Sequence, residues 1–233
     1  MTDLFEDSPN EQKKADKLIK AGHFDIVNRS PLSLVFNEDC MQVMKRFSDG
    51  HFDLAIVDPP YGLNIAKTGS LGRDKFEAKD WDNAIPDDNY FDELFRVSKN
   101  QILWGANHYI SKIPIDSSCW IVWNKVNGAG DFADCELAWT SFKTAVRKFT
   151  YYFGKENNER IHPTQKPKAL YEWLLMKYAK EGNLILDTHL GSQSSRIAAN
   201  KAGLDFVGFE IDREYYDNGN KRFKNFVSQG VLF

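Results

Sequence analysis

The chain has 233 residues, of which 42% are hydrophobic, so it is long enough to form one large domain with a full core. Its formal net charge of -3 argues against indiscriminate coating of nucleic acid, although local basic clusters can still bind it. The three cysteines have no CxxC spacing and are odd in number, which argues against a disulfide framework or a zinc site and favours a reducing cytoplasm.

Residues 1–30 are the first expected element, a polar and acidic arm with a charged helix from Glu11 to Lys20. This arm has no signal-peptide pattern, and no apolar run in the sequence approaches the length that crosses a membrane. No linker separates a second domain. The sequence therefore predicts a single domain over residues 1–233, located in the cytoplasm and without a membrane partner.

Four carboxylates each follow a short apolar run that reads as a buried strand. In an open parallel sheet, ligands bind in the crevice outside the carboxyl ends of the strands, so four acids at such ends favour a shared site. A lone acid in this place more often caps the next helix. The four acids are Asp39, Asp58, Asp187 and Glu210, after the runs 34–36, 54–57, 184–186 and 206–209.

The second of these runs ends in Asp58-Pro59-Pro60-Tyr61, which reads as a catalytic loop. The two prolines stop the strand because neither can donate to a sheet ladder. The strand tip suits a flipped-out base with an exocyclic amino group: Asp58 and the Pro59 carbonyl each accept one N–H, and Tyr61 stacks on the ring. The alternative is a Pro-Pro turn that only ends a core strand.

Two loops, 62–90 and 141–160, are candidates for contact with nucleic acid because they gather basic residues, the second among aromatic ones. Solvated lysines are the alternative explanation of both. The basic residues are Lys67, Arg73, Lys75 and Lys79 in the first loop and Lys143, Arg147 and Lys148 in the second. Four tryptophans between or near these loops are expected in the core, namely Trp104, Trp120, Trp123 and Trp139.

A hexapeptide, His162-Pro163-Thr164-Gln165-Lys166-Pro167, precedes the helical pattern formed by Leu170, Trp173, Leu174 and Tyr178. On sequence rules alone it can be a proline-bounded helix start with Thr164 as the cap.

Residues 183–212 read as strand, loop, helix and second strand, the order of a nucleoside-binding βαβ unit. Gly191 lets the backbone approach a ligand closely, the helix N-terminus offers free N–H groups, and Glu210 can accept both ribose hydroxyls. A dinucleotide dehydrogenase would need three spaced glycines for a pyrophosphate, whereas only Gly191 is present here. S-adenosylmethionine has no pyrophosphate and fits this loop better.

The tetrapeptide and the hexapeptide, in this order and followed by the βαβ unit, resemble those of DNA amino-methyltransferases of the permuted beta class, which modify adenine N6 or cytosine N4. The resemblance covers the chain from about Pro31 to Phe226. It implies a doubly wound, mostly parallel α/β sheet of seven strands with one antiparallel strand. It also implies S-adenosylmethionine as cofactor, DNA as substrate, no metal, and a bacterial or phage-infected cell.

The resemblance assigns roles to individual residues. Asp58, Pro59, Pro60 and Tyr61 would be catalytic, with Asp58 also next to the cofactor. The remaining cofactor-binding residues would be Asp39 and Cys40 at its adenine, Asp187, Gly191 and Ser192 at its methionine and ribose, Glu210 at the ribose hydroxyls, and Thr164, Gln165 and Lys166 at its amino-acid end.

The chain departs from the family in the cofactor loop. Where the family usually shows Asp-Pro-Phe and a second loop glycine, this chain has Thr188, His189 and Gln193. Loss of that glycine predicts a tightened or reshaped loop. His189 either replaces the aromatic ring by stacking or is a hydrogen-bonded structural histidine.

The C-terminus, Gln229-Gly230-Val231-Leu232-Phe233, follows a helix expected over Arg213 to Phe226. It resembles the peptide by which bacterial DNA-processing proteins bind the replication sliding clamp, with Gln229, Leu232 and Phe233 as the contacts. A tail that folds back onto its own core is the alternative.

The sequence thus predicts a DNA methyltransferase that transfers a methyl group from S-adenosylmethionine to adenine N6, of the kind found in restriction-modification systems, with a homodimer as one way to complete DNA recognition. Asp58 favours adenine because cytosine N4 enzymes more often begin this tetrapeptide with Ser. Two alternatives stay open: cytosine N4 methylation, and a non-catalytic DNA-binding or partner subunit. Gln193 and the short 141–160 segment motivate the second alternative.

Overall fold

The computed structural model describes residues 30–65, 76–128, 133–152, 154–155 and 160–230. The predicted N-terminal arm lies outside these residues, as do Lys67, Arg73 and Lys75 of the first basic loop. Leu232 and Phe233 of the C-terminal motif also lie outside them.

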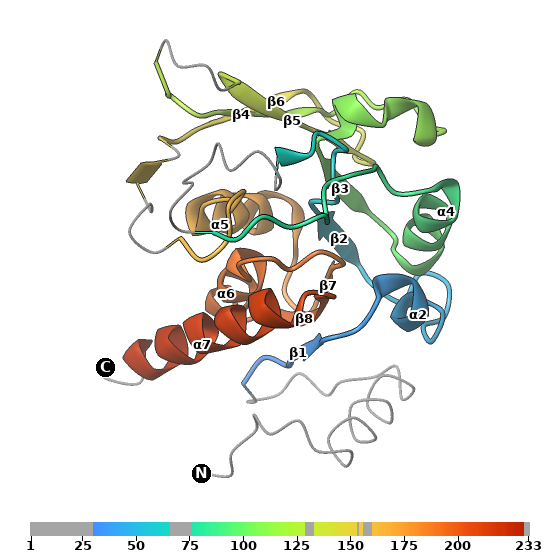
Figure 1. Cartoon of the computed structure of the whole chain (residues 1–233). Helices are drawn as coiled ribbons and strands as arrows, with labels where there is room; N and C mark the ends of the chain where they lie inside the picture. The colour runs from blue at the N-terminus through green and yellow to red at the C-terminus, as the bar shows by residue number, and fades with distance from the viewer. Residues whose placement is uncertain (1–29, 66–75, 129–132, 153, 156–159, 231–233) are drawn as a thin grey trace.

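The described residues form an α/β fold around an eight-stranded sheet (Figure 1). Every neighbouring pair of strands is parallel except the two pairs that β5 makes with β3 and β4. The predicted mostly parallel sheet with one reversed strand is confirmed, although the described sheet has one strand more than the seven predicted. The strands lie in the order β1 (Ser33–Phe36), β8 (Asp205–Phe209), β7 (Leu184–Asp187), β2 (Leu54–Val57), β3 (Gln101–Trp104), β5 (Cys135–Thr140), β4 (Ile121–Asn124) and β6 (Arg147–Thr150).

Strand β2 divides the core into two layers because successive side chains of a strand point to opposite faces of the sheet. Ala55 and Val57 belong to one buried hydrophobic cluster, and Leu54 and Ile56 belong to the other. All four side chains are at most 1% exposed. A strand buried on both faces requires helices on both sides of the sheet.

The helices meet this requirement, as Figure 1 shows. Helices α2 (Cys40–Met44) and α4 (Asp88–Val97) contribute to the cluster that contains Val57. Helices α5 (Lys168–Tyr178) and α6 (Ser194–Lys201) contribute to the cluster that contains Ile56. The other described helices are α7 (Arg213–Gly230), which contacts α6, and the short 3-10 helices η1 (Ala106–His108) and η2 (Ile110–Lys112). None of the described helices is long and apolar enough to span a bilayer.

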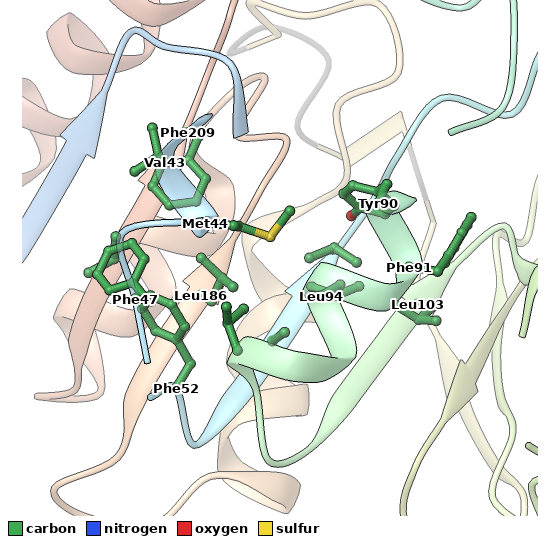
Figure 2. Close-up of a cluster of buried hydrophobic side chains, with 14 of the residues drawn as sticks. Val43, Met44, Phe47, Phe52, Tyr90, Phe91, Leu94, Leu103, Leu186 and Phe209 are labelled. Atoms are coloured by element: carbon green, nitrogen blue, oxygen red, sulfur yellow. The ribbon is translucent and has the colours of Figure 1, made fainter. Parts of the chain in front are cut away.

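Helix α4 shows how the sequence builds one layer of the core. It begins after Asp87, whose side chain accepts a hydrogen bond from the Tyr90 backbone N–H at 3.1 Å and so caps the helix. Tyr90, Phe91 and Leu94 then fall on one face of the helix and are at most 3% exposed. Figure 2 shows Leu94 on the side of the helix toward Leu186 and Met44, and Phe91 on the other side near Leu103.

Some elements differ from the sequence prediction. Thr164 does not cap α5, because the N-cap residue is Pro167 and no side chain caps that end. Strand β6 lies inside the predicted 141–160 loop and was missed because its sequence, RKFT, is mostly exposed and has no buried pattern. Gln229 is still helical, since α7 runs to Gly230, so the predicted extended tail does not begin there.

The predicted tryptophan core is largely confirmed. Trp104, Trp123 and Trp139 are at most 2% exposed, and Trp120 is half-buried against the cluster that contains Val57.

Replacing Leu94 with alanine tests the packing of α4. Leu94 is fully buried, so Leu94→Ala should lower the free energy of unfolding by about 2–5 kcal/mol. Met176→Ala on α5 is the matched control, because that side chain is 73% exposed and its loss should cost less than about 1 kcal/mol. Urea unfolding followed by circular dichroism measures both values, and equal losses would contradict the described packing.

Candidate active site

The four predicted acids lie at one edge of the sheet. Strands β1, β8, β7 and β2 are adjacent and mutually parallel, so their carboxyl ends face the same side. Asp187 is the last residue of β7, and Asp58 and Glu210 directly follow β2 and β8. Asp39 follows β1 and caps α2 by accepting a hydrogen bond from the Met41 backbone N–H at 2.7 Å. The structure therefore places the four acids at one edge of the sheet, as the strand-end argument predicted.

Asp58 is held from two sides. Its Oδ1 accepts a hydrogen bond from the Tyr61 hydroxyl at 2.5 Å, and its Oδ2 lies 2.5 Å from the ammonium nitrogen of Lys166. Burial raises the pKa of Asp58, against the pull of the Lys166 ammonium. Burial also raises the pKa of Tyr61 well above its ordinary value, so this hydroxyl stays protonated and donates.

Lys166 joins the hexapeptide to the tetrapeptide. Its side chain is only 3% exposed, and besides Asp58 it contacts the Glu136 carboxylate at 3.1 Å and the Tyr61 hydroxyl at 3.2 Å. Burial disfavours the ammonium, but Asp58 and Glu136 outweigh burial and raise the pKa of Lys166. The sequence predicted Lys166 at the amino-acid end of the cofactor. Its described contacts are instead with Asp58 and Tyr61 of the tetrapeptide and with Glu136.

Tyr61 depends on a glycine beneath it. Gly105 follows β3 with φ +71°, and a Cβ built there would lie 2.0 Å from Cε1 of Tyr61. Only glycine tolerates both the left-handed backbone and this close approach. The imidazole of His108, the last residue of η1, stacks on the Tyr61 ring. The ring centroids are 5.0 Å apart and the planes are 15° apart.

Asp82 shapes the loop that carries Tyr61. Its carboxylate accepts three backbone hydrogen bonds at 2.8–3.0 Å, from the N–H groups of Tyr61, Gly62 and Ile65. Asp82 is 3% exposed. No sequence pattern marked Asp82, because its partners lie 17–21 positions earlier in the chain.

A pocket of about 480 Å³ opens beside these groups. Residues from the tetrapeptide, the loop after β3, strands β4 and β5, and the hexapeptide line it. Among them are Asp58, Tyr61, Asp82, His108, Lys125, Glu136, Thr164, Gln165 and Lys166. Its volume and mixed lining are typical of a site for a small molecule or a single base.

The βαβ unit builds the neighbouring part of the edge. Glu210 is 8% exposed, and its two carboxylate oxygens accept hydrogen bonds from the backbone N–H groups of Gly191 at 2.8 Å and Asp212 at 2.9 Å. Asp187 accepts from the His189 backbone N–H at 3.0 Å and from the Ser195 hydroxyl at 2.5 Å. Burial raises the pKa of Asp187 to about 7.

Gln193 has a left-handed backbone conformation, which usually favours glycine. Its φ is +58°, and its side chain turns into the α6–α7 interface, where Oε1 accepts a hydrogen bond from Arg196 at 2.8 Å. A Cβ on Gly219 of α7 would lie 2.5 Å from the Gln193 amide nitrogen, so Gly219 makes room for this side chain. The predicted tightening of the loop is therefore not needed, because Gln193 packs away from it.

His189 fits the structural alternative. Its Nδ1 lies 2.9 Å from the Thr188 hydroxyl, and its ring meets Tyr90 edge-on with centroids 5.4 Å apart. Burial lowers the pKa of His189 to about 4, so the imidazole is neutral at pH 7.

Two predicted cofactor contacts on other segments are also placed. Cys40 begins α2 directly after Asp39, and burial raises the pKa of its thiol to about 12. Ser192 is 6% exposed, and its hydroxyl lies 3.1 Å from that of Ser194 at the start of α6.

The basic loops are only partly available to a nucleic acid. Lys79 pairs with Asp212 at 2.8 Å and Glu214 at 2.7 Å, so it ties the loop after the tetrapeptide to the start of α7. In the second loop, Phe142 and Phe149 pack on Tyr178 and Trp173 of α5, respectively. The basic residues of that loop, Lys143, Arg147 and Lys148, are exposed.

Sequence comparison identifies related proteins. Residues 118–221 match the profile of a family described as DNA methylase, of the N6/N4 type. The Type II methyltransferase M.HinfI of Haemophilus influenzae is 24% identical over 83% of this chain and 68% of its own length. The Type II methyltransferase M.HpaI of Haemophilus parainfluenzae is 24% identical over 79% of this chain and 72% of its own.

Solved structures share the fold. The M1.HpyAVI–SAM complex superposes with a TM-score of 0.58 at 19% identity, covering 81% of this chain and 98% of that one. TTHA0409, a putative DNA modification methylase from Thermus thermophilus, superposes with a TM-score of 0.58 at 21% identity. The match covers 84% of this chain and 96% of that one. The cytosine-N4-specific PvuII DNA methyltransferase superposes with a TM-score of 0.53 at 12% identity. The match covers 85% of this chain and 93% of that one.

The fold is the one shared by these solved methylase structures. The matched profile over residues 118–221 and the two Type II methyltransferases support the resemblance to the N6/N4 DNA methylases.

The raised pKa of Asp187 predicts a pH-dependent stability. Its folded-state pKa of about 7 lies above the ordinary 3.8, so the folded protein loses stability as the pH rises through this interval. Asp187→Asn has no carboxyl to ionise and should not show this loss. The unfolding free energy of the variant, relative to that of wild type, should therefore rise by roughly 3 kcal/mol from pH 5 to pH 8, since one pKa unit corresponds to about 1.4 kcal/mol. Urea unfolding at both pH values measures the gain. Asp116→Asn, an exposed control, should show none, and a gain of zero for Asp187→Asn would contradict the burial of that carboxyl.

Proposed function

We propose that this protein is a DNA methyltransferase that transfers a methyl group from S-adenosylmethionine to the N6 amino group of adenine. The observation that carries the proposal is the Asp58 carboxylate, which is held at the end of β2 beside a base-sized pocket and next to the βαβ unit. The names of the relatives, Type II methyltransferases and DNA modification methylases, support DNA as the substrate. Solved neighbours that contain S-adenosylmethionine support the cofactor.

The residues at the sheet edge fit S-adenosylmethionine. Each carboxylate oxygen of Glu210 accepts one backbone hydrogen bond and keeps a further lone pair for a ribose hydroxyl. Ile211, the next residue, is 68% exposed and offers an apolar surface for the adenine ring beside Asp39. Among the described residues no Lys or Arg pairs with Asp187, so its buried carboxyl can receive the cationic amino group of the methionine moiety.

The chain's own residues position the amine. Asp58 and the Pro59 carbonyl accept the two amino hydrogens, which draws the nitrogen lone pair out of conjugation with the ring. Tyr61, fixed by Gly105 below and by Asp82 through the loop, keeps the base in the pocket. When bound, S-adenosylmethionine supplies an electrophilic methyl group, and the nitrogen lone pair forms the new N–C bond while the C–S electron pair stays on sulfur. A proton then leaves the nitrogen to Asp58 and on to water. Positioning supplies much of the rate, without a covalent enzyme intermediate.

Adenine is favoured over cytosine by Asp58 as the first residue of the tetrapeptide. Cytosine N4 is the second candidate, because its exocyclic amine makes the same demands on Asp58 and Pro59. The intact tetrapeptide argues against the non-catalytic alternative, and the side chain of Gln193 packs against α7 and Arg196.

Two interactions remain predictions: a homodimer and binding to a sliding clamp. A homodimer would help a short 141–160 segment to cover a DNA site. Docking on a sliding clamp through Gln229, Leu232 and Phe233 would require the last turn of α7 to open, because Gln229 is helical.

A product assay tests the function. Incubation of duplex DNA with tritium-labelled cofactor should give label in N6-methyladenine after nucleoside digestion, and Asp58→Asn should lose roughly 100-fold or more of the rate. The variant should still bind the cofactor. Label only in N4-methylcytosine would promote the second candidate, and near-normal turnover by Asp58→Asn would remove Asp58 from catalysis.

Calorimetry tests the cofactor site separately. Glu210→Ala should weaken binding of S-adenosylmethionine by roughly 1.5–3 kcal/mol, the scale of hydrogen bonds to a charged group. Glu181→Ala, an exposed acid outside the site, is the control and should bind as wild type does. Unchanged affinity in Glu210→Ala would place the ribose elsewhere, and no binding by wild type would contradict the cofactor.

A further inference from the structure

Four buried or half-buried charges of alternating sign run from the catalytic loop to the outer strands. The Lys166 ammonium lies between the carboxylates of Asp58 at 2.5 Å and Glu136 at 3.1 Å, and Lys125 lies 2.5 Å from the other oxygen of Glu136. Their side chains are 3–21% exposed. They come from the end of β2, the hexapeptide, β5 and the residue after β4. No comparison assigns a role to Glu136 or Lys125.

Lys166 in this place works against the proposed reaction. Its ammonium lies 2.5 Å from Oδ2 of Asp58 and the Tyr61 hydroxyl donates to Oδ1, so the amino group of a base must share either oxygen with a donor that is already bound. Methyl transfer also places positive charge on that amino nitrogen, and a nearby ammonium opposes this charge. The site therefore needs a second acceptor for Lys166.

Glu136 is placed to be that acceptor. It lines the same pocket, it already contacts Lys166, and its Oε2 is buried without a hydrogen bond of good geometry. Burial opposes its ionisation, but the ammonium groups of Lys166 and Lys125 outweigh burial and lower the pKa of Glu136. Glu136 is therefore a carboxylate at pH 7 and can take up the full charge of Lys166.

We propose that Glu136 is a positioning residue that draws Lys166 away from Asp58 when the target base enters, with Lys125 holding Glu136 in place. The inference rests on the proposed function and deepens it. With Glu136 present, the four charges sum to zero; without it they sum to +1, which opposes the positive charge that develops on the amine. Without Glu136, Asp58 is the one carboxylate among the described residues that still pairs with Lys166, so Lys166 competes with the base.

Six titratable groups from six segments face Asp58, and their charges determine the direction in which its pKa moves in each variant. Tyr61, Tyr109 and Tyr171 stay neutral because burial raises the pKa of each well above its ordinary value. Loss of the Glu136 charge should lower the pKa of Asp58, and loss of the Lys166 charge should raise it. The groups are Tyr61, Tyr109, Glu136, Lys166, Tyr171 and Asp187.

The test compares Glu136→Gln and Lys166→Met by the pH profile of kcat and by a 13C NMR titration of the Asp58 carboxyl in the protein without DNA. In Glu136→Gln, kcat should fall by roughly 10- to 100-fold, since misplacing a reacting group by about 1 Å costs on the order of 100-fold. Its affinity for S-adenosylmethionine should not change. The acid limb of the profile and the carboxyl titration should move to lower pH in Glu136→Gln and to higher pH in Lys166→Met. A merely structural role would not move them in opposite directions.

Glu172→Gln is the matched control, because that acid pairs with Lys201 on the surface of α5 and should leave kcat and the profile unchanged. Wild-type turnover and an unmoved titration in Glu136→Gln would overturn the proposal. If Glu136→Gln does not fold, Lys125→Met replaces it: loss of the ammonium that holds Glu136 should lower kcat without changing the affinity for S-adenosylmethionine, and wild-type turnover would again overturn the proposal. A wild-type protein that methylates no DNA contradicts the proposed function instead, and the NMR titration still decides the charge coupling.

Discussion

The ion pair between Asp58 and Lys166 is the interaction on which the site depends. It connects the end of β2 to the segment before α5, and so joins two motifs that are 108 positions apart in the chain. A lysine that is 3% exposed would be costly to bury alone, and two carboxylates compensate for that cost. The same pair keeps the carboxylate of Asp58 in a fixed position at the pocket, where the proposed reaction would bring the amine.

The sheet supplies the geometry around this pair. Because β1, β8, β7 and β2 are parallel neighbours, the residues that follow them meet at one edge without any long-range loop. The edge divides into two parts: Glu210 and Asp187 on the βαβ side, and Asp58 with its pocket on the β2 side. In the proposed reaction the cofactor and the base would occupy these two neighbouring parts, which gives the proximity that methyl transfer needs.

The sequence predicted the buried strands and the acids after them because short apolar runs and strand-stopping residues are local signals. Strand β6 escaped because an exposed edge strand has no buried pattern, and Asp82 escaped because its three backbone partners are distant in the chain. Glu136 also lacked a marker: one acid within a mostly apolar strand gives no hint of the lysines that it meets in space. Gln193 shows the reverse case, where the sequence suggested a reshaped loop and packing against Gly219 removed the need for it.

The central claim is that the Asp58 site transfers a methyl group to adenine in DNA. Its most direct test is sequencing that maps modified bases in DNA from cells that express the protein. The account predicts methylated adenine at one recurrent sequence with wild-type protein, and none with Asp58→Asn produced at the same level. Unmodified DNA in both cells, or equal modification in both, would contradict the assignment of methyl transfer to the Asp58 site.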